Sequence, residues 1–334
     1  LAQAEHVPVH LGSMLRAVST TVAAVASLEE GDVILVNDPF VGGSHLPDVM
    51  VIAPVFFDGA LVGYAATRAH QADIGGMEPG SMPANSREIY QEGIIIPPVK
   101  LYRRGELQHD LLELVLANVR TPEERRGDFN AQLAAIRIGE RRVKELAERY
   151  GAARLAAGFE AILAYAERRM RKQLAELPAG EYSGEDQLDD DGTVDEPVPV
   201  RVKVLVAEGR MTIDFTGSAL QCRGNINAVA PMTHSAVFFA VLLSSLFFSL
   251  ATLLPYAGLF LPTGNPGYTL PPEHVFSILA GNISFFFAFG YFSARSSQII
   301  QYLDRKRHEE ALRHIHRLLA TGYLIGGFAH DILN

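Results

Sequence analysis

Apolar residues gather in three short runs in the first third of the chain. The runs are rich in β-branched side chains and are bounded by turn residues, a pattern typical of strands, and they cover residues 33–36, 49–57 and 61–66. The second and third runs are joined by Asp58-Gly59, a dipeptide that favours a two-residue hairpin turn. The sequence therefore predicts a short strand followed by an antiparallel hairpin.

Three longer segments carry apolar residues at helical spacing, and they predict helices over residues 110–118, 121–150 and 152–177. Thr121-Pro122-Glu123-Glu124 supplies an N-cap, a proline at the first helical position and acids in the first turn. Residues 181–215 return to strand and turn patterns. Mixed strands and helices of this kind predict an α+β fold for this part of the chain.

The charge pattern changes abruptly after Arg223. No Asp, Glu, Lys or Arg occurs between Arg223 and Glu273, and a second uncharged run covers residues 275–294. Each run is long enough to cross a bilayer as a helix at roughly 1.5 Å per residue, and basic residues flank both. These features predict a two-helix transmembrane hairpin over residues 241–294, with membrane contact through residues 236–294 and an inner-membrane location. The alternative is that both runs are buried elements of an enzyme.

Composition narrows the class of protein. The 334 residues suffice for two domains, and the net charge of −9 argues against nucleic acid as a partner, because phosphate binding needs a basic face. Cys222 is the single cysteine, so an internal disulfide is excluded and a reducing compartment is indicated. We therefore expect residues 1–240 to be cytoplasmic.

Three metal-capable side chains lie around the predicted hairpin. His45 and Asp48 are expected on a loop just before its first strand, and His70 just after its second. A hairpin brings its two ends together, so these residues can converge, and their N and O donors suit Mn²⁺, Fe²⁺ or Zn²⁺. On the residues alone, the alternative that these groups cap turns stays open.

Further polar and glycine residues lie near these three. Asp38 and Asp73 are predicted to act as acid/base groups or to orient the metal ligands. The Gly75-Gly76 pair would allow a close backbone approach beside them. The acid cluster at residues 189–191 is predicted to be a solvated turn rather than a calcium site, because the remaining ligands of a calcium loop are missing.

Long stretches around the candidate metal ligands resemble the hydantoinase B family. They are GDVILVNDPFVGGSHLPDVMVIAPVF, RAHQADIGGMEPGSMPANSREIYQEGIIIPPVKLY and LANVRTPEERRGDFNAQLAAIRIGERRVKEL, and the resemblance extends over residues 7–240. This family includes the B half of ATP-dependent 5-oxoprolinases and N-methylhydantoinases and the related subunit of acetone and acetophenone carboxylases. The resemblance implies a partial catalytic domain of this family over residues 1–240.

The resemblance also implies an activity. The leading expectation is a B subunit of an ATP-dependent cyclic amide hydrolase, and the alternative is a carboxylase-type subunit. A hydantoinase A-like subunit would bind ATP and activate a small cyclic amide, and the two would form an oligomer. In the carboxylase branch, residues matching His45, Asp48 and His70 bind manganese with a glutamate from farther upstream. Manganese is therefore the expected ion, with zinc or iron as alternatives, one ligand is expected to be missing, and the chain alone is expected to be inactive.

The end of the chain resembles a different family. The segment FAHDILN at residues 328–334 is similar to the phosphoacceptor box of sensor histidine kinases, in which a histidine on a dimerisation helix accepts phosphate. This resemblance implies a helical dimerisation segment over residues 295–334 with His330 as the acceptor. The meeting of two families near residue 240 predicts a junction, produced by a gene fusion or an artefactual join, and an inactive hybrid or a fragment of a membrane sensor as further alternatives.

Overall fold

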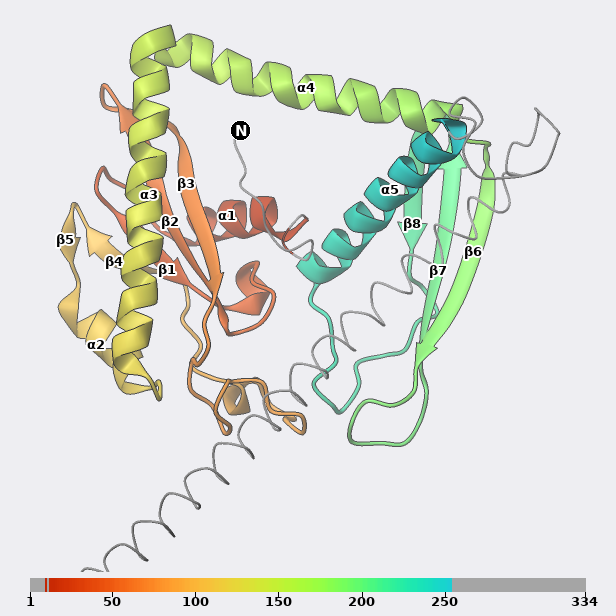
Figure 1. Ribbon diagram of the computed structural model, residues 1–334, viewed down its shortest axis with the longest axis horizontal. Helices are drawn as coiled ribbons and strands as arrows, with labels where there is room; N and C mark the ends of the chain where they lie inside the picture. Colours follow the sequence, from red (N-terminus) through yellow and green to blue (C-terminus); the bar gives the residue numbers. More distant parts are fainter. Residues whose placement is uncertain (1–9, 11, 254–334) are drawn as a thin grey trace, which may run out of the picture. The chain divides into compact units, whose positions relative to one another are not determined.

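A five-stranded antiparallel sheet forms the first part of the protein, in the strand order β3-β2-β1-β4-β5 (Figure 1). The computed structural model describes residue 10 and residues 12–253, with only the backbone of residues 242–253. The strands are β1 (Val33–Val36), β2 (Asp48–Phe57), β3 (Ala60–His70), β4 (Val99–Arg103) and β5 (Glu106–Leu107). The long β2–β3 hairpin therefore lies at one edge of the sheet.

Helices cover both faces of this sheet. Val33 and Leu35 belong to the cluster that packs against α2 (His109–Ala117) and α3 (Pro122–Tyr150). Ile34 and Val36 pack with Ala17 of α1 (Ser13–Ala24), on the other face. Alternate residues of a strand point to opposite faces, so β1 is buried throughout and forms a continuous apolar run.

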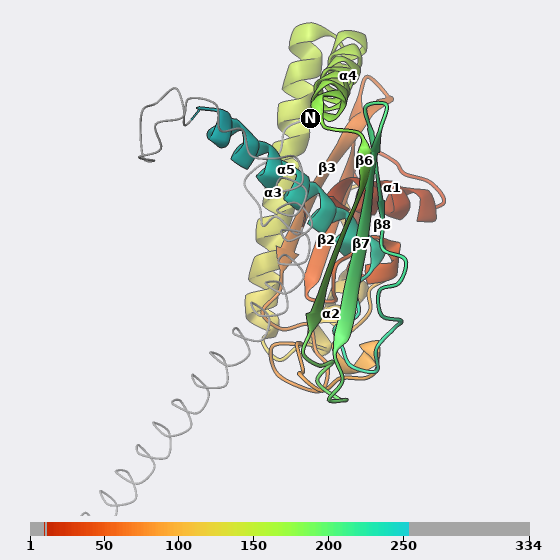
Figure 2. The ribbon, with the colours of Figure 1, turned by 90° about the vertical axis from the view of Figure 1, so that its right-hand side faces the viewer.

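A smaller three-stranded sheet follows, made of β6 (Gly180–Leu188), β7 (Val198–Ala207) and β8 (Arg210–Asp214). The helix α4 (Ala152–Glu176) extends from the end of α3 to this sheet (Figures 1 and 2). Alternate residues of β7 (Val202, Val204 and Val206) are buried against Ala240 of α5 (Ala230–Leu253). This core explains why valine recurs at every second position of β7, where the side chains face the helix.

The predicted α+β class and the predicted elements agree closely with the structure. The helices expected over residues 110–118, 121–150 and 152–177 correspond to α2, α3 and α4. Asp58 and Gly59 have φ angles of 49° and 76°, as a two-residue hairpin turn with right-handed strand twist requires. The helix α1 was not predicted. β2 and β3 also extend farther than expected, to Asp48 and His70.

The start of the uncharged region packs inside the protein. Ser235, Ala236 and Ala240 are fully buried in α5, and Gly12 N–H donates to Ser235 Oγ over 3.1 Å. Burial against α1 and β7 thus accounts for the apolar character of Ala236 and Ala240, whereas Phe238 is 53% exposed. Within the described part of the chain, no helix is both long and apolar enough to cross a membrane. The transmembrane hairpin therefore remains a prediction without support.

The remaining predictions for the tail fall on residues 254–334, which lie outside the described residues. They include the rest of the hairpin at 241–294, the helical segment at 295–334 and the phosphoacceptor His330.

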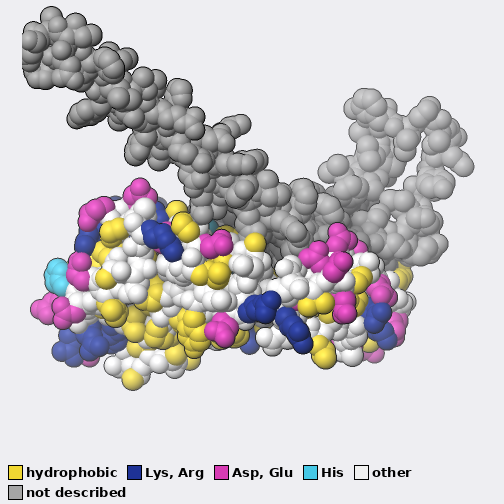
Figure 3. Space-filling model, turned by 90° about the horizontal axis from the view of Figure 1, so that it is seen from below, with side chains coloured by type: hydrophobic (Ala, Val, Ile, Leu, Met, Phe, Trp, Pro, Cys, Tyr) yellow, Lys and Arg dark blue, Asp and Glu magenta, His cyan; other side chains and the backbone are white. Residues whose placement is uncertain are grey.

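On the face drawn in Figure 3, the described basic side chains lie among acidic and apolar ones.

One residue of the acid cluster at residues 189–191 differs from the predicted solvated turn. Asp191 is buried rather than solvated. Its carboxylate accepts hydrogen bonds from the backbone of Thr193 and Val194, from the Thr193 hydroxyl and from Gly224 N–H, the last over 2.9 Å. These donors hold the pKa of Asp191 well below its usual range. The residue therefore joins the β6–β7 loop to the segment before α5, a contact between distant positions that local sequence patterns do not reveal.

Candidate metal centre

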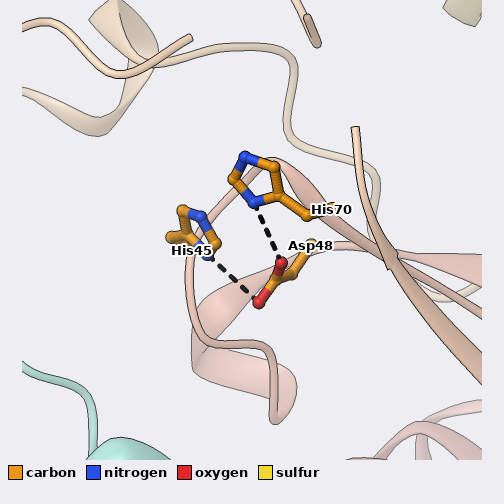
Figure 4. Close-up of side chains that lie close together, drawn as sticks. All are labelled: His45, Asp48 and His70. Carbon is orange, nitrogen blue, oxygen red and sulfur yellow. Dashed lines mark hydrogen bonds and ion pairs between the residues drawn. The ribbon is translucent and has the colours of Figure 1, made fainter. Parts of the chain in front are cut away.

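The open end of the β2–β3 hairpin brings three side chains together (Figure 4). Asp48 begins β2, His70 ends β3, and the two are direct partners in the antiparallel ladder. His45 lies on the preceding loop, whose turn is closed by a hydrogen bond from Asp48 N–H to the carbonyl of His45 over 3.1 Å. The predicted convergence of the three residues is thus confirmed, but Asp48 and His70 lie within the ladder and not on loops beside it.

The two imidazoles face the two oxygens of one carboxylate. His45 Nδ1 lies 3.2 Å from Asp48 Oδ2, and His70 Nδ1 lies 3.3 Å from Asp48 Oδ1. The two rings are stacked, with centroids 4.9 Å apart and an interplanar angle of 30°. One ligand atom from each residue falls within 4.8 Å of the others.

The carboxylate is buried while the imidazoles are accessible. The side chain of Asp48 is 3% exposed, against 33% for His45 and 50% for His70. Burial alone would raise the pKa of Asp48, but hydrogen bonds from His45, His70 and the Ser44 hydroxyl and the charge of His45 outweigh it. The pKa of Asp48 is therefore well below its usual range, and the group is an anion at neutral pH.

Two polar residues hold the loop that carries His45. The Ser44 hydroxyl donates to Asp48 Oδ2 and lies 3.5 Å from His45 Nδ1. Asn37 is buried, and its amide donates to the carbonyls of Leu46 and Ile94 over 2.8 and 2.9 Å. The side-chain amide oxygen of Asn37 accepts from Ile96 N–H over 2.7 Å. Asn37 thus joins the loop, at the residue after His45, to the backbone of the irregular segment 94–96.

The donor set fits a divalent transition metal. Two neutral imidazoles and a carboxylate are ligands for Mn²⁺, Fe²⁺ or Zn²⁺, and a three-ligand set leaves positions for water or substrate. Separations of 3.2 and 3.3 Å between nitrogen and oxygen are close to those of adjacent ligands around one ion at roughly 2.1 Å. Among the described residues, no other group of three or more His, Cys, Asp or Glu side chains clusters in this way.

Asp38 and Asp73 are occupied elsewhere. Asp38 is the N-cap of the short helix η2 (Pro39–Val41) and accepts from Phe40 N–H over 2.9 Å. Asp73 is buried and accepts from the backbone of Gly75, Gly80 and Arg120 and from the Arg120 guanidinium. Within the described residues, the hydrogen bonds of both carboxylates go to these loop donors. Their acid/base or orienting role therefore stays a prediction.

The Gly75-Gly76 pair does allow a close backbone approach, as predicted, but to the protein's own chain. Gly75 and Gly76 have φ angles of 90° and 85°. A Cβ on Gly75 would lie 2.5 Å from the carbonyl oxygen of Asn118, and one on Gly76 would lie 2.5 Å from that of Gln91. The second contact packs this loop against the helix η3 (Ile89–Gln91).

Three residues near the centre were missed by the sequence analysis. Arg68 precedes His70 by two positions on β3, a spacing that places both on one face of the strand and could have revealed it. His10 lies 3.9 Å from Asp48 Oδ2, and no local pattern indicates it. Glu92 accepts from the Ser86 hydroxyl over 2.9 Å, and burial raises the pKa of Glu92 despite that bond and the charge of His45.

The fold and the site together define an α+β domain with a candidate mononuclear metal centre of the two-histidine, one-carboxylate kind. The sequence profile of the hydantoinase B/oxoprolinase family matches residues 1–247. The chain therefore belongs to this family, as its motifs predicted.

Known relatives agree with this assignment. Caprolactamase subunit beta of Pseudomonas jessenii is 39% identical over 193 residues, which cover 58% of this chain and 33% of the relative. A 5-oxoprolinase of Dictyostelium discoideum is 32% identical over 290 residues, which cover 85% of this chain and 23% of the relative. That alignment is longer than the family match, so the similarity continues into the uncharged region.

Two solved structures share the fold of this chain. The crystal structure of ATP-dependent caprolactamase from Pseudomonas jessenii has a TM-score of 0.69 at 34% identity and covers 72% of this chain and 42% of that chain. Acetone carboxylase has a TM-score of 0.61 at 22% identity over 69% of this chain and 32% of that chain, which shows the fold alone. The chain spans less than half the length of these relatives. Neither the family match nor the relatives support the sensor-kinase interpretation of the tail.

Proposed function

We propose that this chain is part of the B subunit of an ATP-dependent cyclic amide hydrolase and that His45, Asp48 and His70 bind a divalent metal ion for it. The observation that carries the proposal is the convergence of the three donors on the hairpin end of a hydantoinase B/oxoprolinase domain. Manganese is the preferred ion, as the family resemblance implies. Zinc and iron are the alternatives, because imidazole and carboxylate donors suit all three ions.

Each residue of the centre has a distinct part in this function. Asp48, buried and ionised, supplies a fixed negative charge, while the exposed sides of His45 and His70 leave the centre open to a substrate. When bound there, a divalent ion would polarise a carbonyl or lower the pKa of a water molecule. Ser44 keeps Asp48 Oδ2 oriented toward the His45 ring.

The substrate and the partner follow from the relatives. The names of several relatives specify caprolactam, 5-oxoproline or hydantoin chemistry, all of which concern a small cyclic amide. The caprolactamase relative is a subunit beta, so a second subunit exists in that enzyme. We assign ATP binding to a hydantoinase A-like partner subunit, in a cytoplasmic hetero-oligomer. This sequence contains no G-x-x-x-x-G-K-[ST] phosphate loop of its own.

A carboxylase-type subunit is the second candidate. The structure of acetone carboxylase shares the fold, but its 22% identity is lower than the 34% identity to the caprolactamase structure. The hydrolase is therefore favoured. The two candidates differ in what they consume, because only the carboxylase would require bicarbonate.

The metal centre is tested first by equilibrium dialysis of the full chain against Mn²⁺. We expect about one ion per chain for the wild type, none for His70→Ala, and an unchanged value for His109→Ala, an exposed histidine at the start of α2. Stoichiometric Mn²⁺ on folded His70→Ala would contradict the assignment of this ligand.

The reaction is tested by adding the chain to a hydantoinase A-like subunit with ATP and a five- to seven-membered lactam or a hydantoin. Ring opening coupled to ADP formation, lost in His70→Ala and retained in His109→Ala, is the outcome that supports the hydrolase. Product formation that depends on bicarbonate would assign the carboxylase reaction instead.

A further inference from the structure

A pair of buried glutamines lies between α3 and the end of the β2–β3 hairpin that carries the metal centre. Gln132 belongs to α3, which packs on both strands of the hairpin (Figure 1). Gln71 directly follows His70, the last residue of β3. Gln71 is 0% and Gln132 5% exposed, and Gln71 Nε2 donates to Gln132 Oε1 over 3.3 Å. Neither residue is a ligand of the proposed centre.

Hydrogen bonds of this pair reach the backbone on either side of the two metal ligands in the β2–β3 ladder. On the inner side, Gln132 Nε2 donates to the carbonyl of Val49 over 3.0 Å. On the outer side, the backbone N–H of Gln71 donates to the carbonyl of Pro47 over 2.8 Å. Because the two glutamine side chains are bonded to each other, they tie both positions to α3 as one unit.

The open end of the hairpin has few other contacts of the ladder type. β3 is the outermost strand of its sheet, so it pairs with β2 alone among the described strands. The β2–β3 pairing ends at Asp48 and His70. The ends of an element open more easily than its middle, because fewer neighbours hold them. The separation of Asp48 from His70 therefore depends on contacts from outside the ladder, and Gln132 supplies one from α3.

The carbonyl of Val49 determines how both amides are oriented. A carbonyl only accepts hydrogen bonds, so the atom of Gln132 that faces Val49 must be the nitrogen. The oxygen of Gln132 then faces Gln71 and accepts from its nitrogen. This arrangement leaves Gln71 Oε1 buried, without a hydrogen-bond partner among the described residues.

Stability alone does not favour such a pair. A buried acceptor without a partner costs free energy, whereas replacement of both bonded partners by apolar groups of the same shape is nearly neutral or stabilising. Phe129 and Ile136, which flank Gln132 on the buried face of α3, belong to the same apolar cluster as Val49. Apolar side chains would therefore suit this position, and the polar pair points to a role other than stability.

We infer that Gln132 and Gln71 are positioning residues of the metal centre: they bond the end of the hairpin to α3 and so hold Asp48 and His70 at the separation that one ion requires. Groups that orient metal ligands typically change metal affinity by about 10- to 100-fold when they are removed. The glutamines act through the backbone, so we expect the lower end of this range. The inference rests on the proposed metal centre.

The positioning role is measured by the affinity of the full chain for Mn²⁺, with thermal unfolding as the check on folding. In the double variant Gln71→Met/Gln132→Met, we expect a melting temperature equal to or above that of the wild type and an affinity about 10-fold lower. Gln108→Met is the matched glutamine control, because the Gln108 amide donates to the carbonyl of Glu106 in β5. Its affinity for Mn²⁺ should equal that of the wild type.

Ile136→Ala separates positioning from a general loosening of α3. Ile136 is buried on the same face of α3 as Gln132, so its truncation removes packing but no bond to the hairpin. We expect a lower melting temperature and an unchanged affinity of the folded variant for Mn²⁺. A purely structural role of the glutamines would lower the melting temperature of the double variant and leave its affinity unchanged. That result, or equal losses of affinity in Ile136→Ala and the double variant, would overturn the inference.

Hydrogen exchange of the metal-free full chain tests the same bonds without an ion. The backbone N–H of Gln71 should exchange at least about 10-fold faster in Gln132→Met than in the wild type, because the end of the hairpin opens more often. The N–H of Asn37, which donates to the carbonyl of Ile96 over 3.0 Å, is the reference and should exchange at the same rate in both proteins. Equal exchange of the Gln71 N–H in the two proteins would show that Gln132 does not hold the hairpin end, and would overturn the inference.

The two proposals fail in different ways. If the wild type binds no Mn²⁺, Zn²⁺ or Fe²⁺, the proposed metal centre is overturned, and with it the positioning role of the glutamines. If the wild type binds metal and the double variant binds it equally well, only the inference about the glutamines is overturned.

Discussion

Asp48 and His70 are direct partners at the open end of the β2–β3 hairpin, with His70 Nδ1 3.3 Å from Asp48 Oδ1. Their pairing depends on the whole ladder, which runs from the two-residue turn at Asp58-Gly59 to the Asp48–His70 pair and contains one irregularity in register, between Val55 and Phe56. Side chains alternate between the two faces of a strand, so a slip of one residue would turn His70 away from Asp48. The hairpin is therefore the element that makes the metal centre.

The carboxylate of Asp48 is expected to be essential for metal binding. Asp48→Asn keeps the shape of the side chain but removes the charge and one acceptor. We therefore expect the affinity for Mn²⁺ to fall by more than about 100-fold, which is more than the loss of a residue that only orients a metal ligand typically causes. Asp38→Asn is the matched control, because asparagine is as good an N-cap as aspartate. Isothermal titration of both variants measures the difference. Equal losses would show that general acidity of the loop, and not Asp48, holds the ion.

Local patterns in the sequence were sufficient for much of the fold. The apolar runs predicted β1, β2 and β3, and Asp58-Gly59 predicted the turn, because these signals depend on residues close in the sequence. The convergence of His45 and Asp48 on His70 followed from the hairpin alone. The helix α1 was missed, and no element was predicted over its residues.

The contacts that complete the centre could not be predicted in this way. His10 and Arg68 meet through the packing of α1 on the sheet, and the capture of Asp73 by Arg120 joins the end of the hairpin to the loop before α3. Such contacts join residues that are far apart in the sequence. Asp38 and Asp73 were assigned to chemistry because nearness in sequence to the metal ligands was the only available signal, whereas their hydrogen bonds go to loop backbone and to Arg120.

The buried amide of Asn37 is expected to be a large source of stability for the loop that carries His45. Asn37→Ala would leave the carbonyls of Leu46 and Ile94 and the N–H of Ile96 without this partner. Each unsatisfied buried group costs about 1–3 kcal/mol, so we expect a loss of about 3 kcal/mol or more in the free energy of unfolding.

Asn118→Ala is the matched control for this prediction, because the Asn118 amide makes one exposed hydrogen bond, to Leu114. We expect it to cost less than about 1 kcal/mol. Urea denaturation compares the two variants. If both lose the same stability, the network around Asn37 does not hold the loop.

Two glycines with similar backbone angles are expected to respond differently to alanine. Gly59 has a φ of 76° with nothing within 4 Å of an added Cβ, so Gly59→Ala should cost only the strain of the left-handed region, about 1–2 kcal/mol. Gly76 has a φ of 85°, and its Cβ would lie 2.5 Å from the carbonyl oxygen of Gln91. Gly76→Ala should therefore cost more than about 3 kcal/mol.

Denaturation midpoints of the two variants give the difference, which isolates the close approach of the loops from backbone strain. Equal midpoints would mean that the loop around Gly76 can move away from Gln91 at no cost.

Asp73 is expected to make stability depend on acidic pH. Burial alone would raise its pKa, but hydrogen bonds from Gly75, Arg120 and Gly80 outweigh burial and hold the folded-state pKa below the ordinary value of about 3.9. A carboxyl group with a depressed pKa contributes stability that is fully present above the unfolded-state pKa and is lost as the pH falls through the folded-state value. Asp73→Asn should therefore be less stable than the wild type at about pH 7, and the gap should narrow below about pH 4.

Urea denaturation at intervals between about pH 7 and about pH 2.5 measures this gap. Arg120→Gln provides the second test, because its guanidinium contacts Asp73 Oδ2 over 3.0 Å. Removal of the guanidinium should raise the folded-state pKa of Asp73, so the acid-induced loss of stability in Arg120→Gln should be smaller than in the wild type and complete at a higher pH. In the double variant Asp73→Asn/Arg120→Gln, the loss of stability that depends on Asp73 should be absent altogether. A gap between wild type and Asp73→Asn that stays constant across this range would show that Asp73 has the same pKa in the folded and unfolded states, and that its bonds to Arg120 and the loop do not favour the ionised form.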